Sequence, residues 1–179
     1  MASSSITWSS SKKFKALLGT NMRKRSKYKP KGVRLDVMAY VQSGMMNIDD
    51  VKDAGVMLRI KNHAAMASLA KGTGTRDDVD VIIGAMNIAE ALALNGKGKD
   101  WWNELREAQN AILSLAQRGL KHDDRFVFTG LELKAINLGM DIHDAQLTDC
   151  TVKELETALN LVQREIKQKR ARVISETAA

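Results

Sequence analysis

The chain has 179 residues, of which 44% are hydrophobic and 27% are charged, so it holds enough apolar material for one packed domain. Aromatic residues make up only 4% and there is one proline, which disfavours a β-sandwich and a proline-rich linker protein. The single cysteine, Cys150, excludes an internal disulfide and a zinc site built from cysteines. No apolar run reaches the roughly 18 residues that a membrane-spanning helix needs.

The net charge of +7 is concentrated at the N-terminus. Ten basic residues and no acidic residue precede Asp36, which leaves 18 of the 28 bases together with all 21 acids in the rest of the chain. We therefore expect a basic, disordered arm over residues 1–34 and a single helical domain over residues 35–179. A second basic patch lies near the C-terminus, at Arg164, Lys167, Lys169, Arg170 and Arg172.

Such an arm can neutralise phosphates, bind an acidic protein or fold back onto its own body. Two aromatic residues within it, Trp8 and Tyr28, could stack on nucleic-acid bases. The six arm residues that we expect to contact an anionic ligand are Arg23, Lys24, Arg25, Lys27, Tyr28 and Lys29.

The start of the chain has two interpretations. Residues 1–11 are rich in serine and free of acids, as in an organellar transit peptide, but they lack the apolar segment of a secretory signal. Met22 opens a compact basic block and is an alternative start, in which case residues 1–21 are a dispensable extension. Mutation of the initiator codon tests this interpretation.

From Asp36 onward the apolar spacing is helical almost throughout. A short helix is predicted over residues 35–43, closed by Gly44. Asn47 resembles an N-cap followed by an acidic first turn, and the helix that it opens should continue to Gly72. The apolar stripe of that helix consists of Val51, Ala54, Leu58, Ala65 and Leu69.

Two long helices are predicted next. The first should begin at Thr75 and stop at Asn95, where an Asn-Gly pair follows the last apolar residue. The second should be capped by Asp100 and end at Gly119. Both carry apolar side chains at steps of three and four, which is typical of helices that pack against neighbours.

Residues 126–128 are the one stretch with extended character. Capping-box patterns at Thr129 and Thr151, each with a glutamate three residues later, predict two further helix starts. The first of these helices should reach Leu147 and the second Val173. The apolar stripe of the last helix has near-heptad spacing, so it could close the bundle or pair with a copy of itself.

Together these patterns predict an all-α fold: a helical bundle of four long helices plus a short one, with the basic, flexible arm at its N-terminus. The short loops favour antiparallel neighbours. Because a bundle of this size has several apolar stripes to cover, we expect a homo-oligomer.

Arg59 and His63 are four residues apart and therefore share one face of a helix, with Asn62 nearby. One interpretation is a contact with a phosphate or another anion, to which all three side chains would contribute. The other is that His63 is a hydrogen-bonded histidine at the edge of the core, which is the commoner role.

The densest polar cluster holds Asp141, His143 and Asp144. The two aspartates have the spacing of helical metal ligands, but His143 points elsewhere and no Glu-x-x-His pair occurs, so we expect no metal site. His143 paired with either aspartate could act as a general base. A buried polar network between helices is the interpretation that we favour, and His143 and Asp144 are retained as candidate ligand-binding residues.

Trp101 and Trp102 are adjacent, so one should face the core and the other solvent or a partner. We predict that Trp102 is the exposed one and that it anchors a partner.

Three segments occur in a fixed order: the basic block at residues 23–30, Ile-Lys-Asn-His-Ala-Ala-Met at residues 60–66, and Ile-His-Asp-Ala-Gln at residues 142–146. In this order they resemble a group of small helical proteins encoded by tailed phages and prophages of Gram-negative bacteria. The resemblance covers residue 22 to about residue 172. In that group the basic block begins the chain, which supports a start at Met22. The group is mostly uncharacterised, so the resemblance implies a setting and no catalytic residue.

We therefore expect a non-enzymatic phage accessory protein in the cytoplasm of the bacterial host, without a cofactor. It would bind an anionic partner, nucleic acid or nucleotide, through its arm and helical body. No recognition-helix motif is present, so sequence-specific readout is not predicted. The alternative is a phage counter-defence protein that blocks a host immune complex or sequesters its nucleotide signal. A small hydrolase that uses His143 ranks last, because no nucleophile and base can be paired in the sequence.

Overall fold

The computed structural model describes residues 37–51 and 53–168, and the regular structure in these ranges is helical, as predicted. The helices are α1 (Val37–Met45), α2 (Ala54–Ala70), α3 (Arg76–Leu94), α4 (Trp102–Lys121), α5 (Gly130–Thr148) and α6 (Val152–Lys167), joined by two short 3-10 turns, η1 (Ile48–Asp50) and η2 (Lys99–Trp101). The predicted basic arm at residues 1–34, the alternative start at Met22 and the predicted helix end at Val173 lie outside the described residues.

The number of long helices differs from the prediction. Five helices of 16 to 20 residues are present within residues 37–168, together with the nine-residue α1. Each of the five was predicted as a segment, so the total of four long helices was an undercount. The last of them, α6, was predicted from Thr151, and its apolar stripe packs against α3. None of the described helices is long and apolar enough to cross a membrane.

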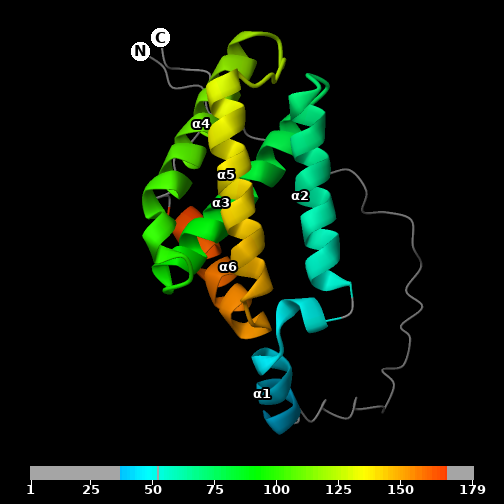
Figure 1. Cartoon of the computed structure of the whole chain (residues 1–179), viewed down its shortest axis with the longest axis vertical. Coiled ribbons are helices and arrows are strands. Elements are labelled where there is room, and N and C mark those ends of the chain that lie inside the picture. The colour runs from blue at the N-terminus through cyan, green and yellow to red at the C-terminus, as the bar shows by residue number, and fades with distance from the viewer. Residues whose placement is uncertain (1–36, 52, 169–179) are drawn as a thin grey trace, which may run out of the picture. The chain divides into compact units, whose positions relative to one another are not determined.

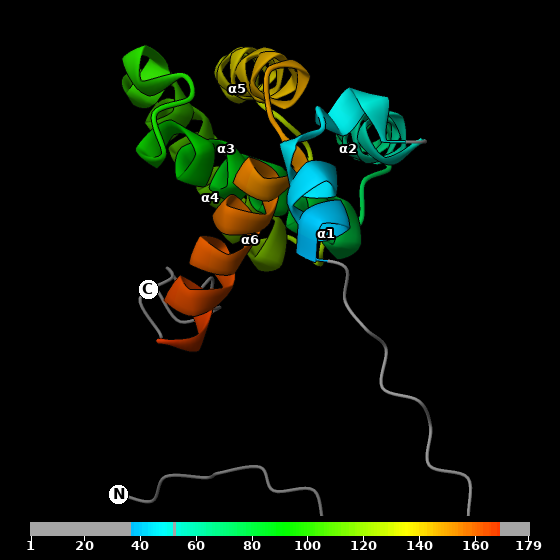
Figure 2. The ribbon, with the colours of Figure 1, turned by 90° about the horizontal axis from the view of Figure 1, so that it is seen from below.

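Helix α3 lies at the centre of this arrangement, in contact with α2, α4, α5 and α6 (Figures 1 and 2). Eight of its residues are buried, among them Ile82, Met86 and Leu92, which have no exposed surface. The main apolar core therefore surrounds α3, and the other long helices are arranged by their contacts with it.

Three helix starts are set by local sequence, as predicted. Thr75, Thr129 and Thr151 each accept a hydrogen bond from a backbone amide three residues later. In each case the carboxylate of the residue at that position, Asp78, Glu132 or Glu154, accepts a hydrogen bond from the backbone amide of the threonine. These reciprocal bonds satisfy amides that the first turn of a helix cannot pair internally.

The start of α2 was predicted too early. Asn47 does act as an N-cap, but the amide that its side chain accepts from belongs to Asp49, and the result is the single turn η1. Asp53 then has a left-handed backbone conformation, with φ of 62°, which interrupts any helix. The helix proper therefore begins at Ala54.

Two further boundaries differ from the prediction. Gly44 lies within α1 and does not end it, because that helix continues to Met45. Asp100 belongs to η2 and provides no side-chain cap for α4, which begins at Trp102 and extends beyond Gly119 to Lys121. Single polar or glycine residues are weaker boundary signals than a reciprocal capping box.

Close approach of helices and loops depends on small residues. A Cβ atom at Gly139 of α5 would lie 2.6 Å from the Cβ atom of Ala108 in α4 and 2.9 Å from the Sδ atom of Met86 in α3.

The predicted extended stretch also appears: Phe126 is buried and forms an isolated antiparallel bridge with Gly74. This bridge connects the loop before α5 to the loop after α2.

Candidate functional site

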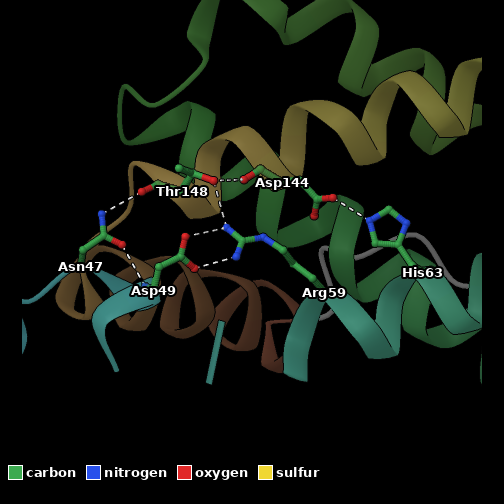
Figure 3. A network of polar contacts seen from close by, with 6 residues as sticks. All are labelled: Asn47, Asp49, Arg59, His63, Asp144 and Thr148. Atoms are coloured by element: carbon green, nitrogen blue, oxygen red, sulfur yellow. Dashed lines mark hydrogen bonds and ion pairs between the residues drawn. The ribbon is translucent and has the colours of Figure 1, made fainter. Parts of the chain in front are cut away.

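A network of polar side chains joins η1, α2 and the C-terminal half of α5 (Figure 3). At its centre Arg59 of α2 donates to both carboxylate oxygens of Asp49, with N–O distances of 2.6 and 3.1 Å. The second guanidinium nitrogen also donates to the hydroxyl of Thr148, at 3.0 Å. Arg59 therefore connects the turn before α2 to the end of α5.

Asn47 reinforces the same junction. Its side-chain amide donates to the carbonyl oxygen of Thr148 at 2.7 Å, while its side-chain oxygen accepts from the amide of Asp49. The hydroxyl of Thr148 donates to the carbonyl oxygen of Asp144, one turn earlier in α5. The last turn of α5 is thus held by side chains that lie about 90 to 100 positions away in the sequence.

His63 lies one turn after Arg59 and forms a separate pair with Asp144. Its Nε2 atom is 2.6 Å from a carboxylate oxygen of Asp144, and about half of the imidazole side chain is exposed. The other carboxylate oxygen of Asp144 is buried and has no hydrogen-bond partner. Among the described residues, no hydroxyl or thiol group is hydrogen-bonded to His63.

The electrostatics of the network favour ion pairs within the protein. The hydrogen bond to Asp49 raises the pKa of the Arg59 guanidinium, although partial burial opposes the shift. Both predicted anion-binding side chains, Arg59 and His63, have carboxylate partners at hydrogen-bonding distance. An incoming anion would have to displace these carboxylates, so the geometry favours a structural junction over an open anion site.

His143 lies within α5, and its side chain is completely buried. The side chains of Asp141 and Asp144 do not form hydrogen bonds with it. Burial lowers the pKa of His143 to about 4, an effect that the nearby charge of Asp144 only partly opposes. Gln146 also opposes the shift, but neither ring nitrogen has a hydrogen bond of normal length and angle. The carboxylate that pairs with a histidine here is Asp144, and its partner is His63.

Asn62 does not join the network, although it is adjacent to His63 in sequence. Its side chain is buried on the inner face of α2 and its amide nitrogen has no hydrogen-bond partner. Gln146 of α5 is also buried, and its amide donates to the carbonyl oxygens of Ala89 and Lys97. Polar side chains are therefore buried between the helices, but both ring nitrogens of His143 and the amide nitrogen of Asn62 have no hydrogen-bond partner of normal geometry, so they do not form the hydrogen-bonded network that the sequence favoured.

The prediction for the two tryptophans is reversed. Trp101 is the exposed one, with half of its surface accessible, whereas Trp102 packs against a small apolar cluster that contains Leu105 and Ile142. The guanidinium of Arg106 lies over the Trp102 ring, 5.3 Å from its centre. Trp102 therefore stabilises the start of α4 and is not a free anchor for a partner.

A groove that the sequence did not indicate lies between α3, α4 and α6, with a volume of about 520 Å³. Its lining is mainly apolar. In the polar part of that lining, Glu90 pairs with Arg106 at 3.4 Å and accepts a hydrogen bond from Gln109 at 2.7 Å. The lining residues are Ile83, Met86, Asn87, Glu90, Ala91, Leu94, Arg106, Gln109, Ile112, Leu113, Leu161, Val162, Glu165 and Ile166.

No group of three or more metal-ligating side chains is present among residues 37–51 and 53–168. Of the predicted ligand-binding residues, the structure brings together Arg59, His63 and Asp144. Asn62 and His143 are buried apart from this network, and Trp102 packs against another cluster. The six predicted arm residues from Arg23 to Lys29 lie outside the described part of the chain. Sequence reasoning missed Asp49 and Thr148, because nothing local links either residue to Arg59.

Comparisons with known proteins found no matching family model, no matching curated protein and no matching solved structure.

Proposed function

We propose that the protein is a non-enzymatic nucleic-acid-binding protein whose basic N-terminal arm contacts the phosphate backbone. The observation that carries the proposal is the segregation of charge: ten bases and no acid precede Asp36, while the remaining chain has an excess of acids. A polyanion is attracted most strongly to a segment whose positive charges have no acidic neighbours in sequence.

The arginines of the helical body support the proposal, because four of them are paired with carboxylates of the same body. Arg59, Arg76, Arg106 and Arg118 are each paired with a carboxylate of the body, at N–O distances of 2.6 to 3.4 Å. Such pairing leaves these arginines poorly placed to neutralise phosphates. The body's role in the proposal is therefore to present the arm, and the binding energy comes mainly from the arm.

The alternative, sequestration of a nucleotide signal, would need a cationic pocket in the helical body. The groove between α3, α4 and α6 has one cation in its lining, Arg106, against two carboxylates, Glu90 and Glu165. Because Arg106 is already paired with Glu90, phosphates would meet a net negative lining. The groove therefore favours nucleic-acid binding through the arm over nucleotide binding in the body.

The absence of an enzyme activity and the phage setting are further parts of the proposal. The first rests on the sequence, in which no nucleophile and base can be paired. The phage origin and the bacterial cytoplasm rest on the sequence resemblance alone.

The test is fluorescence anisotropy with labelled double-stranded DNA of random sequence, measured over a series of salt concentrations. In the arm variant, five basic residues are replaced by glutamine: Arg23, Lys24, Arg25, Lys27 and Lys29. If each contacts one phosphate, the slope of log affinity against log salt concentration becomes shallower by about 4.5, at roughly 0.9 per phosphate.

A matched control makes the same change in net charge on the helical body. In this control variant, five exposed basic residues are replaced by glutamine: Lys61, Lys71, Lys99, Arg125 and Lys134. We expect this variant to retain nearly all affinity and salt dependence. Equal losses for both variants would mean that only net charge matters, and unchanged binding by the arm variant would refute the proposal.

A further inference from the structure

The two halves of α2 are attached to the rest of the molecule in different ways. In the second half, Met66 and Leu69 are buried in the main apolar core. In the first half, residues 54–63, the buried residues are Gly55 and Asn62, neither of which has a large apolar side chain. Burial of apolar surface therefore holds the second half much more strongly than the first.

Most of the large apolar side chains of the first half face water. Val56, Met57 and Ile60 are each more than half exposed. Leu58 is half-buried against the apolar cluster at the junction of α5 and α6. The helix also starts without a capping box, because the side chain of Asp53 forms no hydrogen bond to the first turn. Both features make local unfolding of this half easier than unfolding of a capped, buried helix.

Polar side chains supply the hydrogen bonds between this half and α5 (Figure 3). Arg59 donates to the hydroxyl of Thr148 at 3.0 Å, and the Nε2 atom of His63 lies 2.6 Å from the carboxylate of Asp144. The side chains of Arg59 and His63 are 22% and 51% exposed. Because water competes for contacts of this kind, they hold the two helices together only weakly.

The segments on either side are held more firmly. Before α2, Ile48 is buried and its backbone amide donates to the carbonyl oxygen of Cys150 at 2.9 Å. After residue 63, the helix enters the main core at Ala65 and Met66. Residues 54–63 can therefore unfold while the segments on both sides keep their native contacts, as in the local openings of other native proteins.

The first half of α2 lies along the part of α5 that contains His143. Arg59 meets Thr148 of α5, and one turn later His63 meets Asp144, one turn earlier in α5, so the helices are antiparallel here. The ring of His143 is completely buried and has no hydrogen bond of normal length and angle. The charged groups that act on the ring are Asp144 of α5 and Arg59 and His63 of α2, and none of these lies on α3 or α4.

We propose that residues 54–63 form a pH-sensitive switch, which unfolds locally in acid and is held open by a proton on the exposed ring of His143. In the closed form the ring must be neutral, because burial disfavours its charged form. In the open form the ring is hydrated and accepts a proton, so acid shifts the population toward that form. Buried, unpaired atoms of Asn62 and Asp144 also gain water on opening, which lowers its cost.

The direction of the pH effect follows from His143. Its pKa is about 4 in the closed form and about 6.5 when hydrated, so the closed form is favoured above pH 6.5 and loses this advantage as the pH falls. From these two values, the ratio of open to closed protein should rise by about 20-fold between pH 7 and pH 5. His63 acts in the opposite direction, because a proton on its ring strengthens the contact with Asp144.

The test is amide hydrogen exchange of the full chain followed by NMR, with correction for the intrinsic exchange rate at each pH. At pH 7 the amides of residues 58–63 should be protected at least about tenfold less than those of residues 67–70 and of the centre of α3. Their protection should fall by about 20-fold between pH 7 and pH 5. Low concentrations of urea should accelerate exchange in α3 much more than in residues 58–63, since a local opening exposes little surface.

Variants of His143 test the origin of the acid response. His143→Leu cannot take up a proton and should lose the 20-fold response in residues 58–63. His143→Gln, which also cannot titrate, serves if the leucine variant does not fold. His122→Leu, at an exposed position after α4, is the matched control and should keep the response. His63→Gln should open more at pH 7 and still respond to acid, because the titrating ring of His143 is retained.

A second pair of variants tests the polar attachment. Arg59→Gln removes the contacts with Asp49 and Thr148 and should reduce the protection of residues 58–63 by about two- to fivefold at pH 7. Arg76→Gln removes an ion pair with Asp124 at the start of α3 and should leave that protection unchanged.

Three results would overturn the inference. The first is equal protection of residues 58–63 and the centre of α3, which would mean that both exchange through global unfolding. The second is an acid response that persists in both His143→Leu and His143→Gln. The third is the same urea dependence of exchange in residues 58–63 and in α3. The switch is independent of the proposed nucleic-acid binding, so failure of either leaves the other standing.

Discussion

Helices α3 and α1 are both dominated by apolar side chains, yet they have opposite environments. α3 has eight buried residues because four other helices contact it. α1 has none, and among the described helices its main contact is with α6. Apolar composition therefore predicts that a segment needs cover, whereas the number of neighbouring elements decides whether the same chain provides that cover.

The two regions also differ in their polar residues. Around α3 the interior includes polar side chains with unpaired atoms, among them Asn62 and His143. Along α1, by contrast, large apolar side chains are exposed. An unpaired polar atom in the interior and an apolar patch in water are both unfavourable for the folded protein. The sign of a mutation's effect on the free energy of unfolding should therefore depend on which of the two regions it changes.

The largest effect is expected from a cavity in the packed region. Ile82→Ala in α3 removes a side chain with no exposed surface and should lower the free energy of unfolding by about 2 to 5 kcal/mol. Val41→Ala in α1, at a position that is 45% exposed, should change it by less than about 0.5 kcal/mol. Urea denaturation measures both, and a similar cost at the two positions would show that α1 is covered within its own chain.

Acid should destabilise the packed region through His143. Its pKa is lowered from 6.5 to about 4 by burial, so between these values the unfolded chain binds a proton that the folded protein does not. Stability should therefore fall as the pH drops from about 6.5 to about 4, by up to about 3 kcal/mol from this residue.

His143→Leu tests this origin of the acid sensitivity. It should make the stability curve flatter over the same pH range and cost little at neutral pH, since the ring has no hydrogen bond of normal length and angle to lose. His122→Leu, at an exposed position after α4, is the matched control and should leave the curve unchanged. An unaltered curve for His143→Leu would mean that other groups cause the acid sensitivity.

Two glycines in helix interiors should respond with opposite signs. Gly139→Ala brings a methyl group to 2.6 Å from the Cβ atom of Ala108, which should cost about 1 to 3 kcal/mol through displaced helices. Gly84→Ala on α3 has no atom within 4 Å, so it should stabilise by up to about 1 kcal/mol through helix propensity. Thermal denaturation distinguishes these, and equal shifts would contradict the close packing of α4 and α5.

The smallest effect is expected at the boundary between the two regions. Asp49→Asn removes the ion pair with Arg59, whose side chain is 22% exposed, and should cost no more than about 1 kcal/mol. Arg59 keeps its hydrogen bond to Thr148, which limits the loss. A loss of more than about 2 kcal/mol in urea denaturation would show that the junction between η1 and α5 depends on this pair.

Local sequence was sufficient where a structural signal lies within one helical turn. The starts at Thr75, Thr129 and Thr151 follow from capping boxes whose two partners are three residues apart. The apolar stripes and the all-helical fold follow from spacing along single helices, because a side chain's face is determined by its position in the helix. Such interactions form regardless of how the helices later pack.

Tertiary structure alone decided the contacts between distant segments. His63 and Asp144 were both selected from the sequence, but their pairing spans 81 positions and depends on how α2 lies against α5. Whether Trp101 or Trp102 faces the core likewise depends on the direction in which α4 enters the bundle. The groove and the exposed apolar side chains of α1 likewise depend on how the other helices are arranged around α3, since a helix is covered only on the sides where other elements reach it.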